Sequence, residues 1–230
     1  MVPCLTSTGP AMTQALKIDF VSDVSCPWCA IGLQSLEQAV QRLPAGTAVE
    51  LHFQPFELNP QMGPEGQDIG EHLQEKYGAT PEQSQKNREA IAARGAALGF
   101  TFNMGKRDRI YNTFDAHRLL HWAEETAGPA VQKALKQALF KAYFTEGLNP
   151  GDHALLERLA AEVGLDAARA REILAGDEYA AEVRERERFY QQHGIQSVPS
   201  VIVNDRHLIQ GGQPPEVFEQ ALRQIAAGSA

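Results

Sequence analysis

Two of the three cysteines in this 230-residue sequence stand three positions apart, in the stretch Cys26-Pro27-Trp28-Cys29. In such a pair one thiolate can attack a disulfide, and the second thiol can then close an intramolecular disulfide or release a mixed disulfide. A free cysteine is mostly protonated at neutral pH, so this chemistry needs surroundings that favour the anion. The spacing therefore indicates dithiol–disulfide exchange, and the neighbouring elements must supply those surroundings.

A helix is expected to begin at the cysteine pair. Pro27 suits the first turn of a helix, where its missing N–H costs nothing, and an apolar stripe follows it as far as Leu43. Cys26 would then face unpaired N–H groups and the positive end of the helix dipole, which favour a thiolate. Cys29 falls in the first turn on the same face. We therefore predict Cys26 as the exposed nucleophile and Cys29 as the resolving thiol, supported by Pro27 and by the exposed apolar ring of Trp28.

The pair also lies between two predicted strands. Apolar residues alternate with other residues over 16–20 and again over 49–54, and the second run stops at Pro55. A strand, a helix and a strand in this short succession form a βαβ unit, whose two strands are parallel.

Strand patterns return after Gly194. Two short apolar runs flank the turn residues Asn204 and Asp205, which predicts an antiparallel hairpin. The dipeptide Pro214-Pro215 then opens a final amphipathic helix.

Helical periodicity fills the region between these two parts, with Asp152 as a predicted N-cap. A run of mixed charge over 182–188 is expected to form a solvated helix face. The order of elements predicts an α/β protein: a thioredoxin fold, βαβ…ββα, interrupted by an all-helical inserted domain. The predicted divisions are a disordered leader (1–15), a discontinuous thioredoxin-like domain (16–65 and 194–230) and a helical insertion domain (66–193).

Composition narrows the classes of partner. The sequence is 43% hydrophobic, and 21 basic against 29 acidic residues give a net charge of −8. This charge repels phosphate backbones and anionic surfaces, so we expect no nucleic acid and no membrane as partner. No apolar run has the length of a membrane helix, and the N-terminus lacks a signal-peptide pattern. We therefore expect a cytoplasmic protein, with Cys4 as an unpaired thiol in the leader and Met12 as an alternative start.

Two other interpretations of the cysteine pair stay open, namely half of a structural zinc site and a pair of inert buried thiols. Zinc needs four ligands, and no second Cys-x-x-Cys or His-x-x-x-His lies near the pair in sequence. His117 and His121 have a spacing that can bind metal, but no carboxylate or third histidine is spaced to join them. We interpret them as packed or capped histidines and predict no metal site.

Four blocks of sequence carry a resemblance that goes beyond the cysteine pair. They are residues 22–32 around the pair, 53–60 (FQPFELNP), 112–119 (NTFDAHRL) and 194–199 (GIQSVP). In this order they resemble the DsbA-like thioredoxin superfamily, and specifically its FrnE-type branch of cytosolic proteins. The resemblance extends from about Lys17 to Ala227 and is far more specific than Cys-x-x-Cys alone.

The resemblance implies dithiol–disulfide exchange at Cys26 and Cys29, and a cis Val198–Pro199 bond whose proline faces the pair. It also implies that the backbone beside this proline pairs with substrate backbone. The kappa-class glutathione transferases and the 2-hydroxychromene-2-carboxylate isomerases have a serine in the place of Cys26, so the two cysteines favour exchange with a protein or a small disulfide. Ser197 stands where many thioredoxin-like proteins have glycine or threonine, which concerns substrate preference.

Four further residues are candidates for the wall of a groove beside the pair: Asn112, Thr113, His117 and Phe56. The resemblance suggests that the inserted helices contribute the first three to the groove, although Asn112 or Thr113 also fits a helix N-cap. Phe56 fits an apolar rim or, more simply, the core. Asp23 fits a cap or a place near the pair, where its carboxylate would oppose ionisation of the nucleophile.

The predicted function is that of a thiol–disulfide oxidoreductase or disulfide isomerase that acts on protein or small-molecule thiols and disulfides. No cofactor is predicted, and glutathione is a candidate co-substrate. The alternatives are a glutathione-dependent isomerase or transferase of the kappa-class or 2-hydroxychromene-2-carboxylate isomerase type, and a non-catalytic redox-sensing module. The sequence does not determine the reduction potential, the direction of exchange, the substrate or the oligomeric state.

Overall fold

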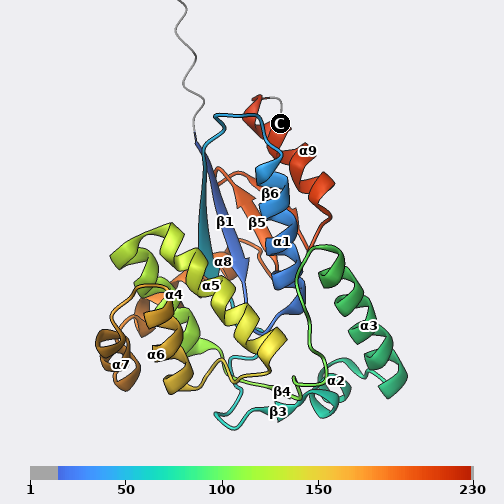
Figure 1. Cartoon of the computed structure of the whole chain (residues 1–230), viewed down its shortest axis with the longest axis vertical. Coiled ribbons are helices and arrows are strands. Elements are labelled where there is room, and N and C mark those ends of the chain that lie inside the picture. The colour runs from blue at the N-terminus through green and yellow to red at the C-terminus, as the bar shows by residue number, and fades with distance from the viewer. Residues whose placement is uncertain (1–14, 229–230) are drawn as a thin grey trace, which may run out of the picture.

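A four-stranded sheet forms the centre of the molecule, whose computed structural model describes residues 15–228 (Figure 1). Its strands, in spatial order, are β2 (Val49–Pro55), β1 (Leu16–Ser22), β5 (Ser200–Val203) and β6 (His207–Gln210). Strand β1 is parallel to β2 and antiparallel to β5, which forms a hairpin with β6. The predicted βαβ unit and hairpin are confirmed. Cys4 and the first fourteen residues of the predicted leader lie outside the described residues.

The hairpin turns where the sequence predicts it. Asn204 and Asp205 have positive φ angles of 53° and 54°. Two successive residues of this kind form the tight turn whose twist suits antiparallel strands, and Asn and Asp tolerate this conformation better than most residues. The Asn204 side chain also accepts the backbone N–H of Lys17 at 3.0 Å, which anchors the turn to the start of β1.

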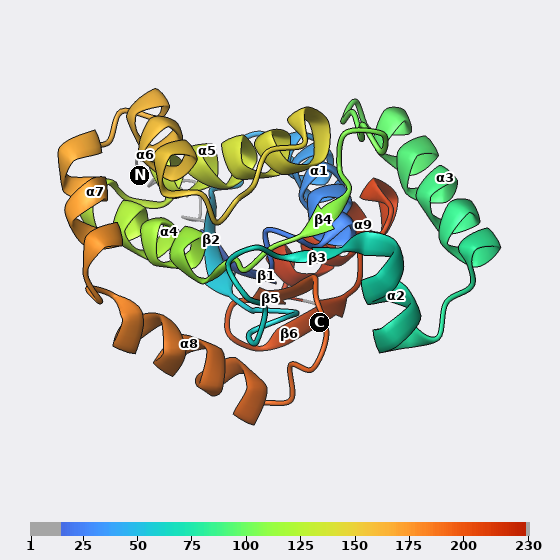
Figure 2. The same ribbon diagram turned by 90° about the horizontal axis from the view of Figure 1, so that it is seen from below.

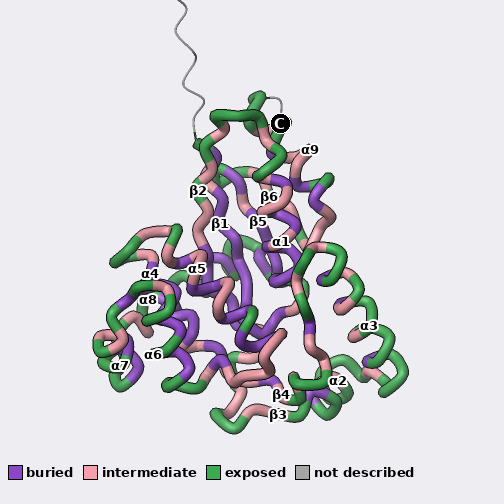
Figure 3. The backbone as a smooth tube through the Cα atoms, viewed as in Figure 1, coloured by how far each residue is buried: buried purple, intermediate pink, exposed green. Residues whose placement is uncertain are grey.

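Helices cover both faces of the sheet. They are α1 (Pro27–Gln41) and α9 (Pro215–Ala226) on one face and α8 (Ala180–Gln192) on the other. Because side chains alternate along a strand, Phe20 of β1 packs with Leu36 of α1 and Phe218 of α9, while the next residue, Val21, packs with Tyr190 of α8. Figure 3 shows buried backbone in β1, β5 and α1 at the centre of the molecule.

The chain between β2 and α8 is mainly helical. Its elements are β3 (Gln67–Asp68), α2 (Ile69–Tyr77), α3 (Pro81–Ala97), β4 (Arg109–Ile110), α4 (Phe114–Ala127), α5 (Pro129–Phe140), the π-helix η1 (Lys141–Glu146), α6 (His153–Glu162) and α7 (Ala167–Ala175). The Asp152 side chain accepts the N–H of Leu155 at 2.8 Å, which confirms the predicted cap. Figure 2 shows α4 to α7 grouped at one side of the view and α2 and α3 at the other, with the β3 and β4 segments between them.

The insertion is not wholly helical, because β3 and β4 pair as a short antiparallel ladder. Each strand has two residues, too few for an alternating pattern to be visible in the sequence. The prediction of a solvated charge run is also wrong in part: Glu187 is 5% exposed, and Arg184 pairs with it at 2.8 Å. Glu187 is buried because it lies on the face of α8 that Val183 and Tyr190 turn toward the core.

Helix α5 is fixed against the edge of the sheet by Gln132. The outer edge of a sheet carries backbone groups that need hydrogen-bond partners. The buried Gln132 amide accepts the N–H of Phe53 in β2 at 2.8 Å and donates to its carbonyl at 3.0 Å. These two bonds take the place of a neighbouring strand and set the rotation of α5 about its axis.

Candidate active site

Cys26 occupies the N-cap position of α1. Its backbone is extended (φ −88°, ψ 113°), and its carbonyl accepts the N–H groups of Cys29 and Ala30 at 3.1 and 3.3 Å. Pro27 starts the helix, so the Cys26 side chain lies at the positive end of the helix dipole as the sequence predicts. The residue is only 4% exposed, so the expectation of a well-exposed nucleophile is wrong.

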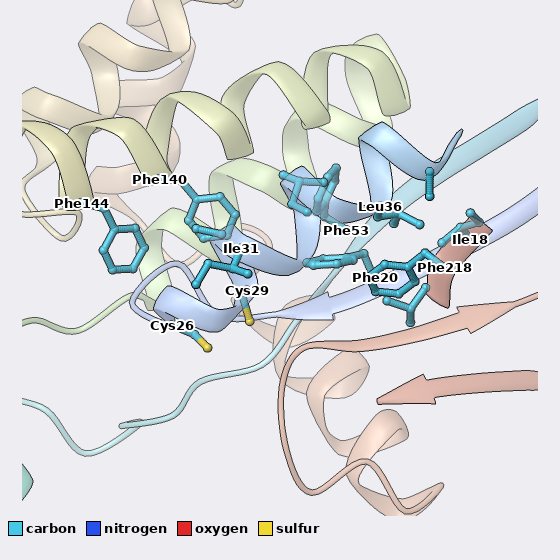
Figure 4. Close-up of a cluster of buried hydrophobic side chains, with 14 of the residues drawn as sticks. Ile18, Phe20, Cys26, Cys29, Ile31, Leu36, Phe53, Phe140, Phe144 and Phe218 are labelled. Carbon is cyan, nitrogen blue, oxygen red and sulfur yellow. The ribbon is translucent and has the colours of Figure 1, made fainter. Parts of the chain in front are cut away.

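Cys29 lies in the first turn of α1 and is fully buried. Burial raises the pKa of its thiol well above the usual cysteine value, and the neighbouring Cys26 raises it further; the charge of Lys136 and a backbone hydrogen bond from Asp23 act in the opposite direction. Cys29 therefore stays protonated at neutral pH and does not begin an attack. Figure 4 shows both sulfur atoms at the start of α1, with Phe140 of α5 on the opposite side of this turn.

The loop before β5 reaches Cys26 from the other side. The Val198–Pro199 bond is cis, as the resemblance implies. The Val198 carbonyl oxygen lies 3.8 Å from the sulfur of Cys26, so the thiol can donate to it. A Cβ added to Gly32 would lie 3.1 Å from Cγ of Pro199, so a glycine at this position of α1 allows the close approach of helix and loop.

Cys26 lines a cleft of about 480 Å³. Its apolar lining includes Trp28, Leu58, Ile69, Leu73, Ile91 and Val198. Arg88 of α3, Arg107 and His72 also line it, and no aspartate or glutamate is among its described lining residues. Arg107 stacks over the ring of Tyr143 at 4.7 Å, and the buried Nε atoms of both arginines have no hydrogen-bond partner among the described residues. In a chain of net charge −8, this cleft carries local positive charge.

Asp23 is a buried carboxylate that joins the loop before α1 to two distant parts of the chain. Its Oδ1 accepts the N–H of Ser25 at 3.1 Å and the hydroxyl of Thr113 at 2.9 Å, and its Oδ2 accepts the N–H of Leu58 at 2.7 Å. The Nε2 atom of His117 lies 3.7 Å from Oδ1. Burial alone would raise the pKa of Asp23, but His117 and the two backbone N–H groups outweigh burial and lower this pKa to about 2.

The four groove candidates do not line the cleft over Cys26. Thr113 and His117 lie behind the loop, against the Asp23 carboxylate. The Asn112 side chain donates to a loop carbonyl at 3.2 Å and accepts the first N–H of α4 at 2.9 Å, so it acts as a local cap. Phe56 is 8% exposed and packs in the core between the sheet and α8.

Two sets of buried charged groups near the site have no signal in the sequence. Lys136 of α5 is fully buried, whereas the side chain of Lys133 in the same helix is 39% exposed. The sequence around the two lysines does not show which of them is buried. Glu57 and Glu187 come from elements far apart in the chain and share Arg184. Burial raises the pKa of both carboxyl groups, and the charge of Glu187 adds to the effect at Glu57.

Within residues 15–228, no group of three or more His, Cys, Asp or Glu side chains could hold a metal ion. His117 instead faces Asp23, and His121 packs edge-on against Tyr179 with its pKa lowered mainly by burial. Among the described helices, none combines the length and the apolar character needed to cross a membrane.

The sheet, the helix that begins at a cysteine pair and the cis-proline loop against Cys26 define a dithiol protein of the thioredoxin fold. More narrowly, the chain belongs to the DSBA-like thioredoxin domain family, whose sequence profile matches residues 17–223. The fold class predicted from the sequence, a thioredoxin fold with a helical insertion, is confirmed.

Known proteins share this arrangement over nearly the whole chain. The crystal structure of a probable DsbA oxidoreductase from Streptomyces coelicolor is 35% identical, with a TM-score of 0.83 over 94% of this chain and 91% of that one. The uncharacterized protein YwbO of Bacillus subtilis (strain 168) is 29% identical, covering 92% of this chain and 96% of YwbO. The cytosolic disulfide reductase DsbM of Pseudomonas aeruginosa, solved with GSH, is 20% identical with a TM-score of 0.63, over 92% and 99% of the two chains, and shares the fold.

Proposed function

We propose that this chain is a thiol–disulfide oxidoreductase in which Cys26 attacks the substrate and Cys29 resolves the mixed disulfide. The observation that carries the proposal is the placement of Cys26 on an open cleft with Cys29 in the same helical turn, fully buried and protonated. The Cys26 thiolate attacks a substrate disulfide, and one substrate thiolate leaves. The Cys29 thiolate then attacks the sulfur of Cys26, the intramolecular disulfide forms, and the second substrate thiolate leaves.

The roles of the two thiols differ in a way that alkylation can measure. Reduced protein treated with a small excess of iodoacetamide at neutral pH should be modified at Cys26, which lines the cleft, and not at Cys29, which does not line it and is fully buried. Peptide mass spectrometry identifies the modified residue. If Cys26 reacts no faster than a free model thiol, its assignment as nucleophile is wrong.

Two substitutions test the exchange itself. Cys26→Ser should abolish disulfide exchange, whereas Cys29→Ser should retain the first attack and accumulate a mixed disulfide with the substrate. Cys4→Ser is the matched control, because it removes a thiol outside the pair and should leave the exchange rate unchanged. Equal activity of Cys26→Ser and the wild type would rule out the proposal.

We also propose that the cleft accepts a small anionic thiol or disulfide, with glutathione as the co-substrate. Support comes from Arg88 and Arg107, which line the cleft together with Cys26 and have no acidic neighbour in its described lining. A guanidinium group binds a carboxylate through two parallel hydrogen bonds, and glutathione has two carboxylates. A cleft of about 480 Å³ has the size of a small-molecule site. DsbM, a structural neighbour, was solved with glutathione.

The test compares an anionic with a neutral substrate. Arg88→Gln and Arg107→Gln should each raise the KM for oxidised glutathione about tenfold, and change the KM for hydroxyethyl disulfide, which is neutral, by less than about twofold. Lys86→Gln is the matched control, because Lys86 is an exposed cation of α3 that does not line the cleft. A similar change of KM for both substrates would show that the arginines do not select for charge.

The glutathione-dependent isomerase or transferase remains the second candidate, favoured by the same basic cleft. Full activity of Cys29→Ser on a small molecule with glutathione, without disulfide exchange, would favour it. Equilibration of the protein with glutathione buffers gives the reduction potential, which decides between reductase, isomerase and oxidase action.

We further propose that the chain belongs to the FrnE-type branch and has a cytoplasmic location. The four sequence blocks support the first proposal, and the cytosolic DsbM neighbour supports the second.

A further inference from the structure

His72 lies on the face of α2 that lines the cleft, together with Ile69, Leu73 and Tyr77. It is 8% exposed, and its Nδ1 atom lies 2.8 Å from Oε1 of Gln67. The other ring nitrogen, Nε2, has no hydrogen-bond partner among the described residues, and it is not one of their fully buried polar atoms without a partner. One nitrogen of the ring is therefore engaged, and the other is accessible in a side chain that borders the cleft.

Gln67 fixes which ring nitrogen of His72 carries the hydrogen. Its Nε2 atom donates to Oε2 of Glu75 at 2.7 Å, and since a carboxylate only accepts, this bond sets the orientation of the amide. The amide oxygen then faces Nδ1 of His72, so Nδ1 is the donor. Burial, and after it the charge of Lys76, lower the pKa of His72 below its usual 6.5, against the opposite effect of Glu75. At neutral pH the ring is thus uncharged and presents the lone pair of Nε2.

The charged groups of the elements around His72 do not occupy Nε2. Asp68 of β3 accepts the N–H of Glu71 at 3.0 Å, and Arg109 of β4 donates to two carbonyls of the loop before β3, both at 3.0 Å. The other charged or titratable groups along α2 and across the cleft are Glu75, Lys76 and Tyr77 of α2, Arg88 of α3, Arg107, and Cys26 before α1. Because none of them is hydrogen-bonded to Nε2, this atom stays available to a ligand.

Three other acceptors of the cleft lining are already engaged. The carbonyl oxygen of Leu58 and Oδ1 of Asn59 each accept the ammonium group of Lys76 at 2.7 Å. Oε1 of Gln83 accepts the N–H of Thr80 at 2.9 Å. The other uncharged polar side chains of the described lining are weaker bases than an imidazole: Ser25, Ser84 and Asn87. His72 is therefore the strongest free acceptor in a cleft whose described lining has no carboxylate.

We propose that His72 selects substrates that carry an ammonium group beside a carboxylate, as the γ-glutamyl end of glutathione does, an inference that rests on the glutathione function proposed above. Nε2 of His72 accepts a hydrogen from the ammonium group, and Arg88 or Arg107 binds the adjacent carboxylate. The arginines alone would accept any small anion of the right size. His72 adds the discrimination between an amino-acid end and a plain carboxylic acid.

Binding can be measured apart from exchange with S-methylglutathione, whose sulfur cannot react with a thiol. The comparison ligand has a glutaryl group in place of the γ-glutamyl group, so it keeps both carboxylates and lacks only the ammonium group. Isothermal titration calorimetry of the full chain at pH 7.5 should show about tenfold tighter binding of S-methylglutathione than of the glutaryl compound.

His72→Phe keeps a ring at this position but has no acceptor. It should bind both ligands about equally, with the affinity that the wild type has for the glutaryl compound. His193→Gln is the matched control, because His193 is an exposed histidine at the end of α8 that does not line the cleft, and it should keep the tenfold preference.

The pH dependence separates an acceptor from a cation. The preference of the wild type should shrink as the pH falls through the lowered pKa of His72, because a protonated Nε2 donates and no longer accepts. If His72 instead bound a carboxylate as an imidazolium, the affinity for S-methylglutathione would rise between pH 7 and pH 5. Such a rise would overturn the proposal.

The remaining outcomes distinguish this inference from the function on which it rests. Equal wild-type affinities for the two ligands would overturn the role of His72 alone, and so would an unchanged preference in His72→Phe. Failure of the wild type to bind either ligand would overturn the glutathione proposal and the role of His72 together. The comparison of the two ligands in the wild type decides even if His72→Phe does not fold.

Discussion

Asp23 holds the loop before α1 through its ionised carboxylate, so its charge should contribute stability that depends on pH. The lowering of its pKa from 3.8 to about 2 corresponds to about 2.5 kcal/mol of folding free energy at neutral pH. Because the folded state has the lower pKa, this contribution is complete above about pH 5 and is lost as the pH falls toward 2. By pH 3 about 1 kcal/mol of it should be gone.

Asp23→Asn keeps the shape of the side chain but exchanges one acceptor oxygen for an NH₂ group. Either the N–H of Leu58 on Oδ2, or the N–H of Ser25 and the hydroxyl of Thr113 on Oδ1, then meets a donor. A hydrogen bond to a charged group contributes about 1.5–3 kcal/mol, and a buried donor left without an acceptor costs about 1–3 kcal/mol. We expect the free energy of unfolding to fall by about 3 kcal/mol at pH 7 and by about 2 kcal/mol at pH 3.

Urea unfolding followed by circular dichroism at pH 7, 5 and 3 measures these differences. Asp166→Asn is the matched control, because the Asp166 carboxylate caps α7 by accepting the N–H groups of Ala168 and Arg169. Asparagine caps a helix as well as aspartate does, so this variant should stay close to the wild type. A destabilisation by Asp23→Asn that is equal at pH 7 and pH 3 would refute the reasoning about its charge.

Three further substitutions test other contacts. Gly32→Ala places a Cβ 3.1 Å from Cγ of Pro199 and should lower the stability by about 1 kcal/mol in thermal unfolding, although alanine normally stabilises a helix; a gain would contradict the close approach. Gln132→Ala removes both hydrogen bonds to Phe53, so the free energy of unfolding in urea should fall by about 2–3 kcal/mol. The N–H of Phe53 should also exchange faster with deuterium, and an unchanged exchange rate would exclude this edge contact. Burial raises the pKa of Glu187, so wild-type stability should decrease as pH rises above 4.5, and Glu187→Gln should lose less stability between pH 5 and 8; parallel urea curves would disprove this.

The sequence allowed the central part of the fold to be predicted, because its signals are local. The alternation in β1 and β2, the proline that starts α1 and the Asn204-Asp205 turn each depend on neighbouring residues. The short ladder of β3 and β4 was not predictable in this way, because two-residue strands have no period.

For the candidate active site too, local sequence signals determined some features and contacts between distant elements determined others. The sequence by itself determined the cysteine pair, its place at the start of a helix and the Val198–Pro199 loop, because spacing along the chain and family blocks carry that information. Only the tertiary structure decided that Thr113 and His117 meet Asp23 instead of lining the cleft. The tertiary structure also decided that Lys136 is buried and that Arg88 and Arg107 both line the cleft. Burial and side-chain contacts arise from elements far apart in the chain. The sequence pattern of a lysine or an arginine is the same whether its side chain faces the core or the solvent.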